Sequence, residues 1–145
     1  MFNEALSDYL PISCGVSQGS VLGPLLFLIY INDLLKYELS PPVLLCADDN
    51  SLTLSGYDPK TIEEKLNKDL HQVQNWLQSN KLTLNVKKTK YIIIRSHYRL
   101  RHLNGHLNAT VGSPQLTRAT NYRYLGIEVE DALEWKSQVK RSLQV

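Results

Sequence analysis

Two adjacent aspartates, Asp48 and Asp49, could bind a metal ion together. The apolar residues 43–47 precede them, and the alternating residues 51–55 follow after Asn50. Because Asp and Asn side chains hydrogen-bond locally and tolerate turn dihedrals, this pattern predicts a β-hairpin with the carboxylates at its tip. Two neighbouring negative charges repel each other unless a cation compensates them, and an oxygen-seeking ion such as Mg²⁺ suits that role.

An aspartate pair in a turn does not by itself identify a metal site. Asp-rich turns are common, and most of them only reverse the direction of the chain. The chemistry of Asp48 and Asp49 therefore depends on the segments that surround them.

Helix signals occur on both sides of the hairpin. Gly23 and Pro24 suit an N-cap and a first helical position, and residues 25–31 are apolar on nearly every face. A helix of this kind is expected to be buried on most sides. After the hairpin, the Asp58-Pro59 pair starts an amphipathic helix that is expected to end near Asn80.

Short strands account for much of the remaining chain. They are predicted at residues 6–14, 82–86, 91–95 and 122–129, with a weak pair at 110–111 and 116–117. Residues 96–108 are predicted to form a loop, and a final helix is expected to start near Asp131 and to continue at Val145. Because helices and strands alternate without regular βαβ spacing, the sequence predicts an α+β fold.

The composition predicts a folded globular chain that is one domain or part of one. The 145 residues are 43% hydrophobic and carry a formal net charge of +2. The apolar residues 21–31 are too short to span a membrane, and the N-terminus has no secretory pattern. Cys14 and Cys46 have no paired spacing, so buried thiols and an intracellular location, in cytoplasm or nucleus, are expected.

Four segments in fixed order resemble one known family. Gly15-Val16-Ser17-Gln18-Gly19-Ser20 is similar to the glutamine-glycine segment of reverse transcriptases, especially those of non-LTR (LINE-like) retrotransposons. Cys46-Ala47-Asp48-Asp49 resembles their catalytic aromatic-Ala-Asp-Asp turn. Trp76, Leu84-Asn85 and Lys88-Thr89 are similar to the helix and lysine segment that follow it. Tyr124-Leu125-Gly126-Ile127 and Leu133-Glu134-Trp135 resemble the primer grip and the start of the thumb.

The resemblance implies a fold and a reaction. Residues 1–129 would be a partial polymerase palm with its primer-grip region, an antiparallel sheet with packed helices, and residues 130–145 the truncated start of a thumb helix. The family catalyses two-metal nucleotidyl transfer. By resemblance, Asp48 would bind Mg²⁺ or Mn²⁺ directly and Asp49 would assist. The implied partners are an RNA template, a DNA primer and deoxynucleotides.

The resemblance also implies binding residues outside the aspartate turn. Gln18, Gly19 and Ser20 would lie against template or nucleotide, although an ordinary loop leading into a helix is the alternative. Lys88 would place a cation near the nucleotide phosphates, and a solvated turn is an equal alternative. Leu125-Gly126 would belong to the primer grip.

Some features depart from the family pattern. Cys46 replaces an aromatic residue, Ser17 a proline and Asn50 a threonine. A third catalytic aspartate would precede the glycine segment, where Asp8 has no matching surroundings. We therefore expect this chain alone to bind metal weakly and not to polymerise. The alternative function is a non-catalytic retrotransposon remnant with at most non-specific nucleic-acid binding; the oligomeric state stays open.

Overall fold

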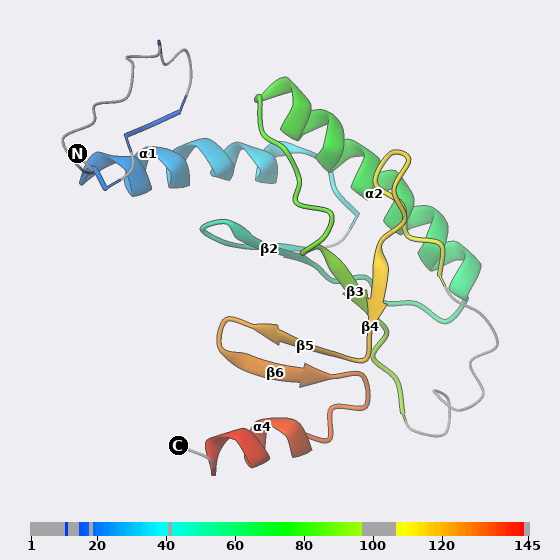
Figure 1. Ribbon diagram of the computed structural model, residues 1–145. Coiled ribbons are helices and arrows are strands. Elements are labelled where there is room, and N and C mark those ends of the chain that lie inside the picture. Colours follow the sequence, from blue (N-terminus) through cyan, green and yellow to red (C-terminus); the bar gives the residue numbers. More distant parts are fainter. Residues whose placement is uncertain (1–10, 12–14, 18, 41, 97–106, 144–145) are drawn as a thin grey trace.

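The computed structural model of the protein describes residues 11, 15–17, 19–40, 42–96 and 107–143 (Figure 1). Helices and short strands occur in mixed order, which confirms the α+β class. The helices are α1 (Leu22–Ile31), the 3-10 helix η1 (Asn32–Lys36), α2 (Pro59–Ser79) and α4 (Lys136–Ser142). The strands are β1 (Val43–Cys46), β2 (Asp49–Leu52), β3 (Lys90–Ile92), β4 (Thr117–Ala119), β5 (Asn121–Tyr124) and β6 (Ile127–Glu130).

The described strands form three separate pairs. β1–β2 and β5–β6 are antiparallel hairpins, whereas β3 and β4 are parallel. The prediction of one antiparallel sheet is therefore wrong for the part of the chain that the structure describes. A parallel pair needs a long crossover, and the 24 residues between Ile92 and Thr117 provide one.

Several predicted strands differ from the observed ones. Residues 82–86 alternate inward and outward but have no ladder partner among the described residues. The weak pair predicted at 110–111 and 116–117 is reduced to an isolated bridge between Thr110 and Gln115, and Thr117 instead begins β4, where it pairs with Lys90. The strand predicted at 91–95 starts at Lys90 and ends at Ile92. The strand predicted at 122–129 is broken into β5 and β6 by a two-residue turn. Apart from Pro11, the strand predicted at 6–14 lies outside the described residues, as do residues 97–106 of the predicted loop.

Helix α2 confirms the predicted amphipathic helix and joins two apolar clusters. Its N-cap, Asp58, accepts hydrogen bonds from the Thr61 backbone N–H at 2.9 Å and from the Thr61 hydroxyl at 2.7 Å, and these bonds lower the pKa of Asp58. Leu70 packs in a cluster with Ala109, Val111 and Leu116, and Trp76 packs in a second cluster with Ile31 and Leu34. In Figure 1, α1 and α2 lie on one side of the strands and α4 lies on the other.

Helix α1 is much more exposed than its sequence predicts. Leu22, Leu25 and Ile29 expose 63%, 54% and 62% of their surfaces. Only Gly23 and Ile31 are buried in this helix, because α1 reaches the Trp76 cluster only through its C-terminal half, where Phe27 also packs. The prediction of burial on most sides is thus wrong among the described residues. None of the helices in this part of the chain is long and apolar enough to cross a membrane.

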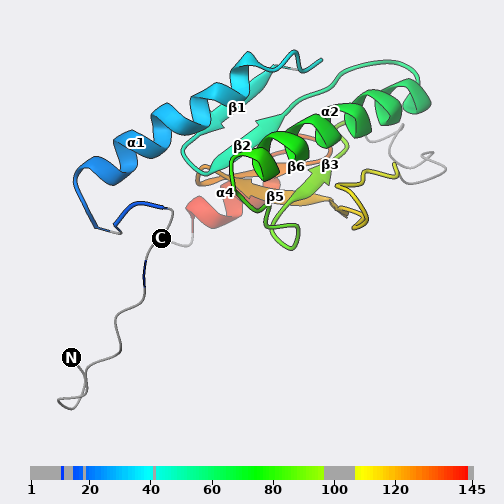
Figure 2. The same cartoon turned by 90° about the horizontal axis from the view of Figure 1, so that it is seen from above.

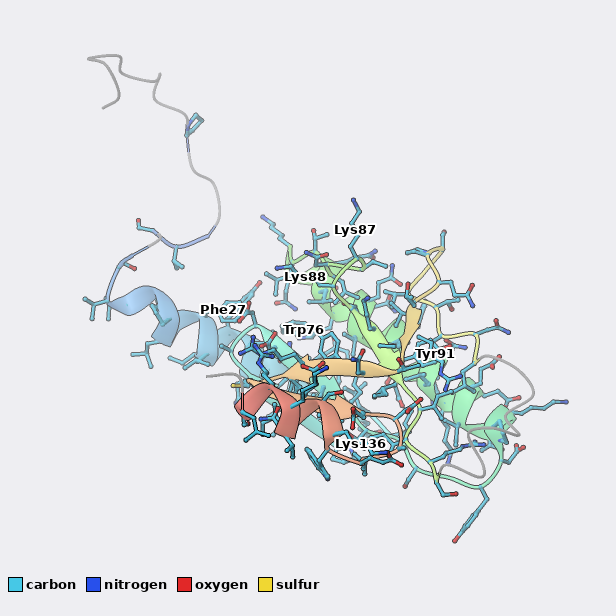
Figure 3. All side chains as sticks on the ribbon, turned by 60° about the horizontal axis from the view of Figure 1, so that its bottom comes forward. Phe27, Trp76, Lys87, Lys88, Tyr91 and Lys136 are labelled. Atoms are coloured by element: carbon cyan, nitrogen blue, oxygen red, sulfur yellow. The ribbon has the colours of Figure 1, made fainter. Side chains whose placement is uncertain are left out.

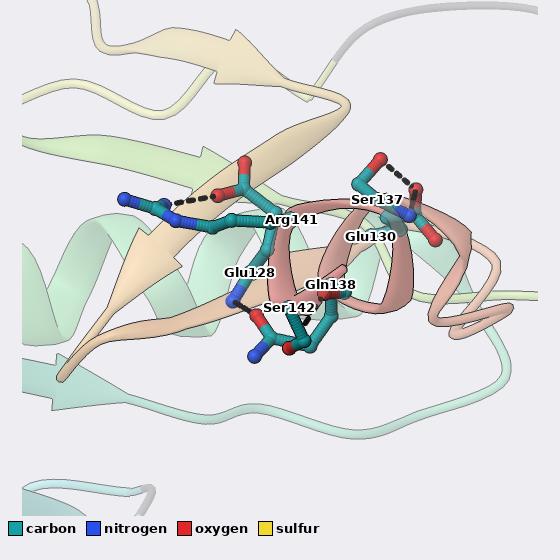
Figure 4. Close-up of polar contacts among 6 residues, drawn as sticks. All are labelled: Glu128, Glu130, Ser137, Gln138, Arg141 and Ser142. Carbon is teal, nitrogen blue, oxygen red and sulfur yellow. Dashed lines mark hydrogen bonds and ion pairs between the residues drawn. The ribbon is translucent and has the colours of Figure 1, made fainter. Parts of the chain in front are cut away.

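The short helix α4 starts at Lys136, five residues later than predicted, and ends at Ser142. Glu130, the last residue of β6, caps it: its carboxylate accepts from the backbone N–H groups of Lys136 and Ser137 at 3.1 and 3.2 Å, and from the Ser137 hydroxyl. Polar contacts also join α4 to Glu128 (Figure 4). The Glu128 N–H donates to Gln138 at 2.9 Å, and its carboxylate pairs with Arg141 at 3.6 Å.

We predict that the exposed face of α1 contributes little to stability. Replacing Leu25 and Ile29 together by glutamine should change the free energy of unfolding by less than about 1 kcal/mol, because surface substitutions rarely matter. The matched change Ile31→Gln should cost more than about 2 kcal/mol, since it buries an amide in an apolar cluster. Urea unfolding measures both. Equal losses for the two variants would show that α1 is covered in solution.

We predict that acid releases α4 from β6. The hydrogen bonds from Ser137 lower the pKa of Glu130 below its usual 4.5. The capping contribution is therefore complete above pH 4.5 and is lost as the pH falls through the lower folded-state pKa. Amide hydrogen exchange in α4 should accelerate in that range. Glu130→Gln should accelerate the exchange already at neutral pH, whereas Glu64→Gln on the exposed face of α2 should not; unchanged exchange in Glu130→Gln would contradict the capping role.

Candidate functional site

The hairpin β1–β2 carries the aspartate pair, but its tip differs by one residue from the prediction. Cys46 pairs with Asp49, so Ala47 and Asp48 form a two-residue turn. Asp49 is the first residue of β2, and Asn50 pairs with Leu45. Ala47 has a left-handed φ of 53°, which an L-residue adopts at a cost. Asp48 therefore lies at the turn, and Asp49 lies on the exposed strand face with Cys46.

Apolar and polar contacts on both sides hold this hairpin in place. Leu45 of β1 packs on the Trp76 cluster, and Leu52 of β2 packs on the Leu70 cluster. Just before β1, the backbone N–H of Ser40 donates to the carboxylate of Asp69 at 3.1 Å. Asp69 is fully buried on α2, so it fixes the approach of the chain to the hairpin. The sequence gives no sign of this role, because nothing in the position of Asp69 along the helix indicates a tertiary partner.

The exposed side of β1 holds a residue whose burial was predicted incorrectly. Cys46 is an exposed free thiol, not a buried one, because the strand register directs it away from Leu45 and toward the face of Asp49. Cys14 lies outside the described residues.

The aspartate turn offers a partial set of metal ligands. Asp48 and Asp49 are both exposed, so their carboxylates are open to a cation. Among the described residues, no cluster of three or more His, Cys, Asp or Glu side chains could hold a metal ion. Mg²⁺ requires six oxygen ligands in a near-octahedral arrangement. Two carboxylates fit such an ion in chemical type, but water or other groups must supply the remaining ligands.

The glycine segment leads directly into α1. Gln18 lies outside the described residues. Gly19 has a φ of 83°, and a Cβ there would meet nothing within 4 Å, so backbone conformation favours glycine at this position. The Ser20 hydroxyl accepts a hydrogen bond from the Gly23 N–H at 3.0 Å. Ser20 therefore acts as a cap for the first turn of α1, which begins at Leu22, and this supports the structural alternative for that residue.

Lys88 lies on an exposed turn between α2 and β3. Figure 3 shows Lys87 and Lys88 near each other on one side of the molecule, with Lys136 on the opposite side. The segment before this turn is held by inward side chains: Leu82 packs on the Trp76 cluster, and Leu84 packs on the Leu70 cluster. Lys88 is therefore presented to solvent from a fixed base.

Leu125 and Gly126 form the turn of the β5–β6 hairpin. Both have left-handed backbone angles, with φ of 48° and 87°, as in a type I′ turn. Leu125 is half exposed despite being apolar. Figures 1 and 2 show the two hairpins one above the other with their turns toward the same side of the molecule. The structure thus places the turns of Asp48 and Leu125 on one side.

Comparisons with known proteins identify one family. The family described as "Reverse transcriptase (RNA-dependent DNA polymerase)" matches residues 1–129, which is most of the chain. A "Retrovirus-related Pol polyprotein from type-1 retrotransposable element R1 2" of Nasonia vitripennis is 23% identical over 129 residues. That match covers 87% of this chain and 32% of the relative, so the chain spans about a third of the length of this protein. No solved structure matches the chain.

We predict that Leu125 strains the β5–β6 turn. An L-residue in the left-handed region costs roughly 1–2 kcal/mol, whereas asparagine tolerates this conformation well. Leu125→Asn should therefore raise the free energy of unfolding by about 1 kcal/mol in urea titrations. The companion variant Gly126→Ala should lower it by about 1 kcal/mol, because a Cβ meets no atom there and only the φ of 87° opposes it. Destabilisation by Leu125→Asn would mean that the packing of Leu125 outweighs its backbone strain.

Proposed function

The chain belongs to the reverse transcriptase (RNA-dependent DNA polymerase) family, and from this premise we propose that it supplies part of a polymerase centre. Residues 1–129 are proposed to be a partial palm with the primer-grip region, and residues 130–145 the start of the thumb. The proposed partners are an RNA template, a DNA primer and deoxynucleotides. Because the chain spans about a third of its retrotransposon relative, the synthesis of DNA is proposed for the longer protein.

The aspartate turn is proposed to hold the catalytic metal ions. Asp48 is the proposed direct ligand of Mg²⁺ or Mn²⁺, and Asp49 assists it. When bound, such ions neutralise charge on the attacking and leaving oxygens of phosphoryl transfer. The described part of the chain contributes by positioning the two carboxylates. Leu45 and Leu52 anchor the hairpin on two apolar clusters, and these clusters hold the strands that carry both aspartates.

The other proposed contacts surround the nucleic acid. Gln18, Gly19 and Ser20 are proposed to lie near template or nucleotide, and Lys88 near phosphate. Leu125-Gly126 is proposed to contact the primer strand. The observation that carries the proposal is the common direction of the two hairpin turns, which would let one bound duplex meet the carboxylates and Leu125 together (Figures 1 and 2).

Metal binding tests the aspartate turn. The 145-residue chain should bind Mn²⁺ weakly, as measured by water-proton relaxation, with Mg²⁺ competing for the same site. Asp48→Asn should weaken Mn²⁺ binding by roughly tenfold or more, and Asp49→Asn by less, because affinity depends on the number of charged oxygen ligands. The matched control is Asp33→Asn, which removes an exposed carboxylate that pairs with Lys36 at 2.8 Å. It should bind Mn²⁺ like the unchanged chain.

Equal Mn²⁺ binding by Asp48→Asn and the unchanged chain would overturn the metal assignment. If the chain binds an RNA–DNA duplex, and Asp48→Asn changes neither this binding nor its response to metal ions, the result would instead support the alternative of a non-catalytic remnant.

A further inference from the structure

Asn85 closes the turn that carries Lys88. Its side-chain oxygen accepts a hydrogen bond from the Lys88 backbone N–H at 3.2 Å. Its carbonyl oxygen accepts from the backbone N–H groups of Lys88 and Thr89 at 3.0 and 2.9 Å. The Thr89 hydroxyl donates to the same carbonyl at 3.0 Å. The side-chain oxygen and the carbonyl oxygen of Asn85 therefore hold Lys88 and Thr89 in place. The backbone at these two residues sets the direction of the Lys88 side chain.

The base of this turn is held by apolar contacts. Leu84 and Val86, the neighbours of Asn85, pack on the Leu70 cluster. Asn85 itself is exposed, as the alternation of an extended segment requires. The side chain of Asn85 thus adds nothing to the core, and its contacts with described residues serve the turn.

The turn presents positive charge to solvent. Lys87 and Lys88 are exposed, and in the described part of the chain neither forms an ion pair with a carboxylate. Lys90 is exposed two residues further along the chain. Unpaired lysines on a fixed turn are suited to phosphate, because a compact ammonium group binds phosphate as a point charge.

We propose that Asn85 is a positioning residue that holds Lys88 toward a phosphate group of the bound nucleic acid. Asparagine suits this role because its amide oxygen reaches the backbone N–H of a following residue and closes a turn. Glutamine carries the same amide on a side chain that is one methylene longer, and alanine offers no acceptor. This inference rests on the proposed function, because it assumes that Lys88 contacts nucleic acid.

The test measures binding of a fluorescently labelled RNA template–DNA primer duplex to the 145-residue chain by anisotropy, between about 50 and 200 mM salt. Lys88→Ala should weaken binding roughly threefold to tenfold and reduce the salt slope by about one. Asn85→Ala should produce roughly half or more of that loss, measured as the logarithm of the dissociation constant. The loss should not exceed that of Lys88→Ala, because the backbone contacts of the turn remain. Lys136→Ala, on the opposite side in Figure 3, should change neither quantity.

The double variant distinguishes positioning from a separate contribution. If Asn85 acts through Lys88, Asn85→Ala combined with Lys88→Ala should bind within about twofold of Lys88→Ala alone. Asn85→Ser should restore most of the binding, because its hydroxyl can accept the same hydrogen bond without adding charge. Asn85→Gln should not restore it. This pair retains a polar group at an exposed position, so it discriminates even if Asn85→Ala unfolds.

The outcomes distinguish a failure of the contact between Lys88 and phosphate from a failure of the positioning role of Asn85. If Lys88→Ala leaves duplex binding and its salt slope unchanged, the phosphate contact fails and the role of Asn85 fails with it. If Lys88→Ala weakens binding but Asn85→Ala does not, or if the two losses add fully, only the positioning role is overturned. Equal binding by Asn85→Ser and Asn85→Gln would also overturn it.

Discussion

The arrangement of this chain depends on the packing of one helix into two apolar clusters. Leu70 and Trp76 lie six residues apart on α2, and each is buried among partners from different parts of the sequence. The aspartate hairpin and the segment before the lysine turn are attached to α2 through these clusters, and Asp69 holds the chain just before the hairpin. Because neither cluster is large, the positions of the aspartate hairpin and of the lysine turn are both sensitive to the integrity of α2.

Polar contacts dominate the attachment of the C-terminal helix. The cap from Glu130 and the contacts of Glu128 with Gln138 and Arg141 join α4 to β6, while Val139 remains exposed. Hydrogen bonds and exposed ion pairs contribute less than apolar burial to stability. The region of α4 is therefore expected to open more easily than the core around Leu70.

Local signals predicted the elements that depend on local interactions. The capping residues and the apolar period of α2 were sufficient, and the hairpin was anticipated from alternation around Asp48. The exposure of α1 was missed, because burial depends on which surfaces are present and not on the helix itself. The break at Leu125 was missed because leucine rarely adopts a left-handed conformation, although Gly126 offered a turn signal. The roles of the site residues were suggested by resemblance, and tertiary partners such as Asp69 and Ser40 had no sequence signature.

The two-residue turn at Ala47–Asp48 limits how this site can change during evolution. Strand side chains alternate between faces, so inserting or deleting one residue in β1 would move Leu45 out of its cluster and direct its neighbours inward. The carboxylates would then be displaced together with the apolar anchor. Divergence here is consequently restricted to substitution at constant length, such as the cysteine at position 46, whereas the exposed connections between other elements can accept changes of length.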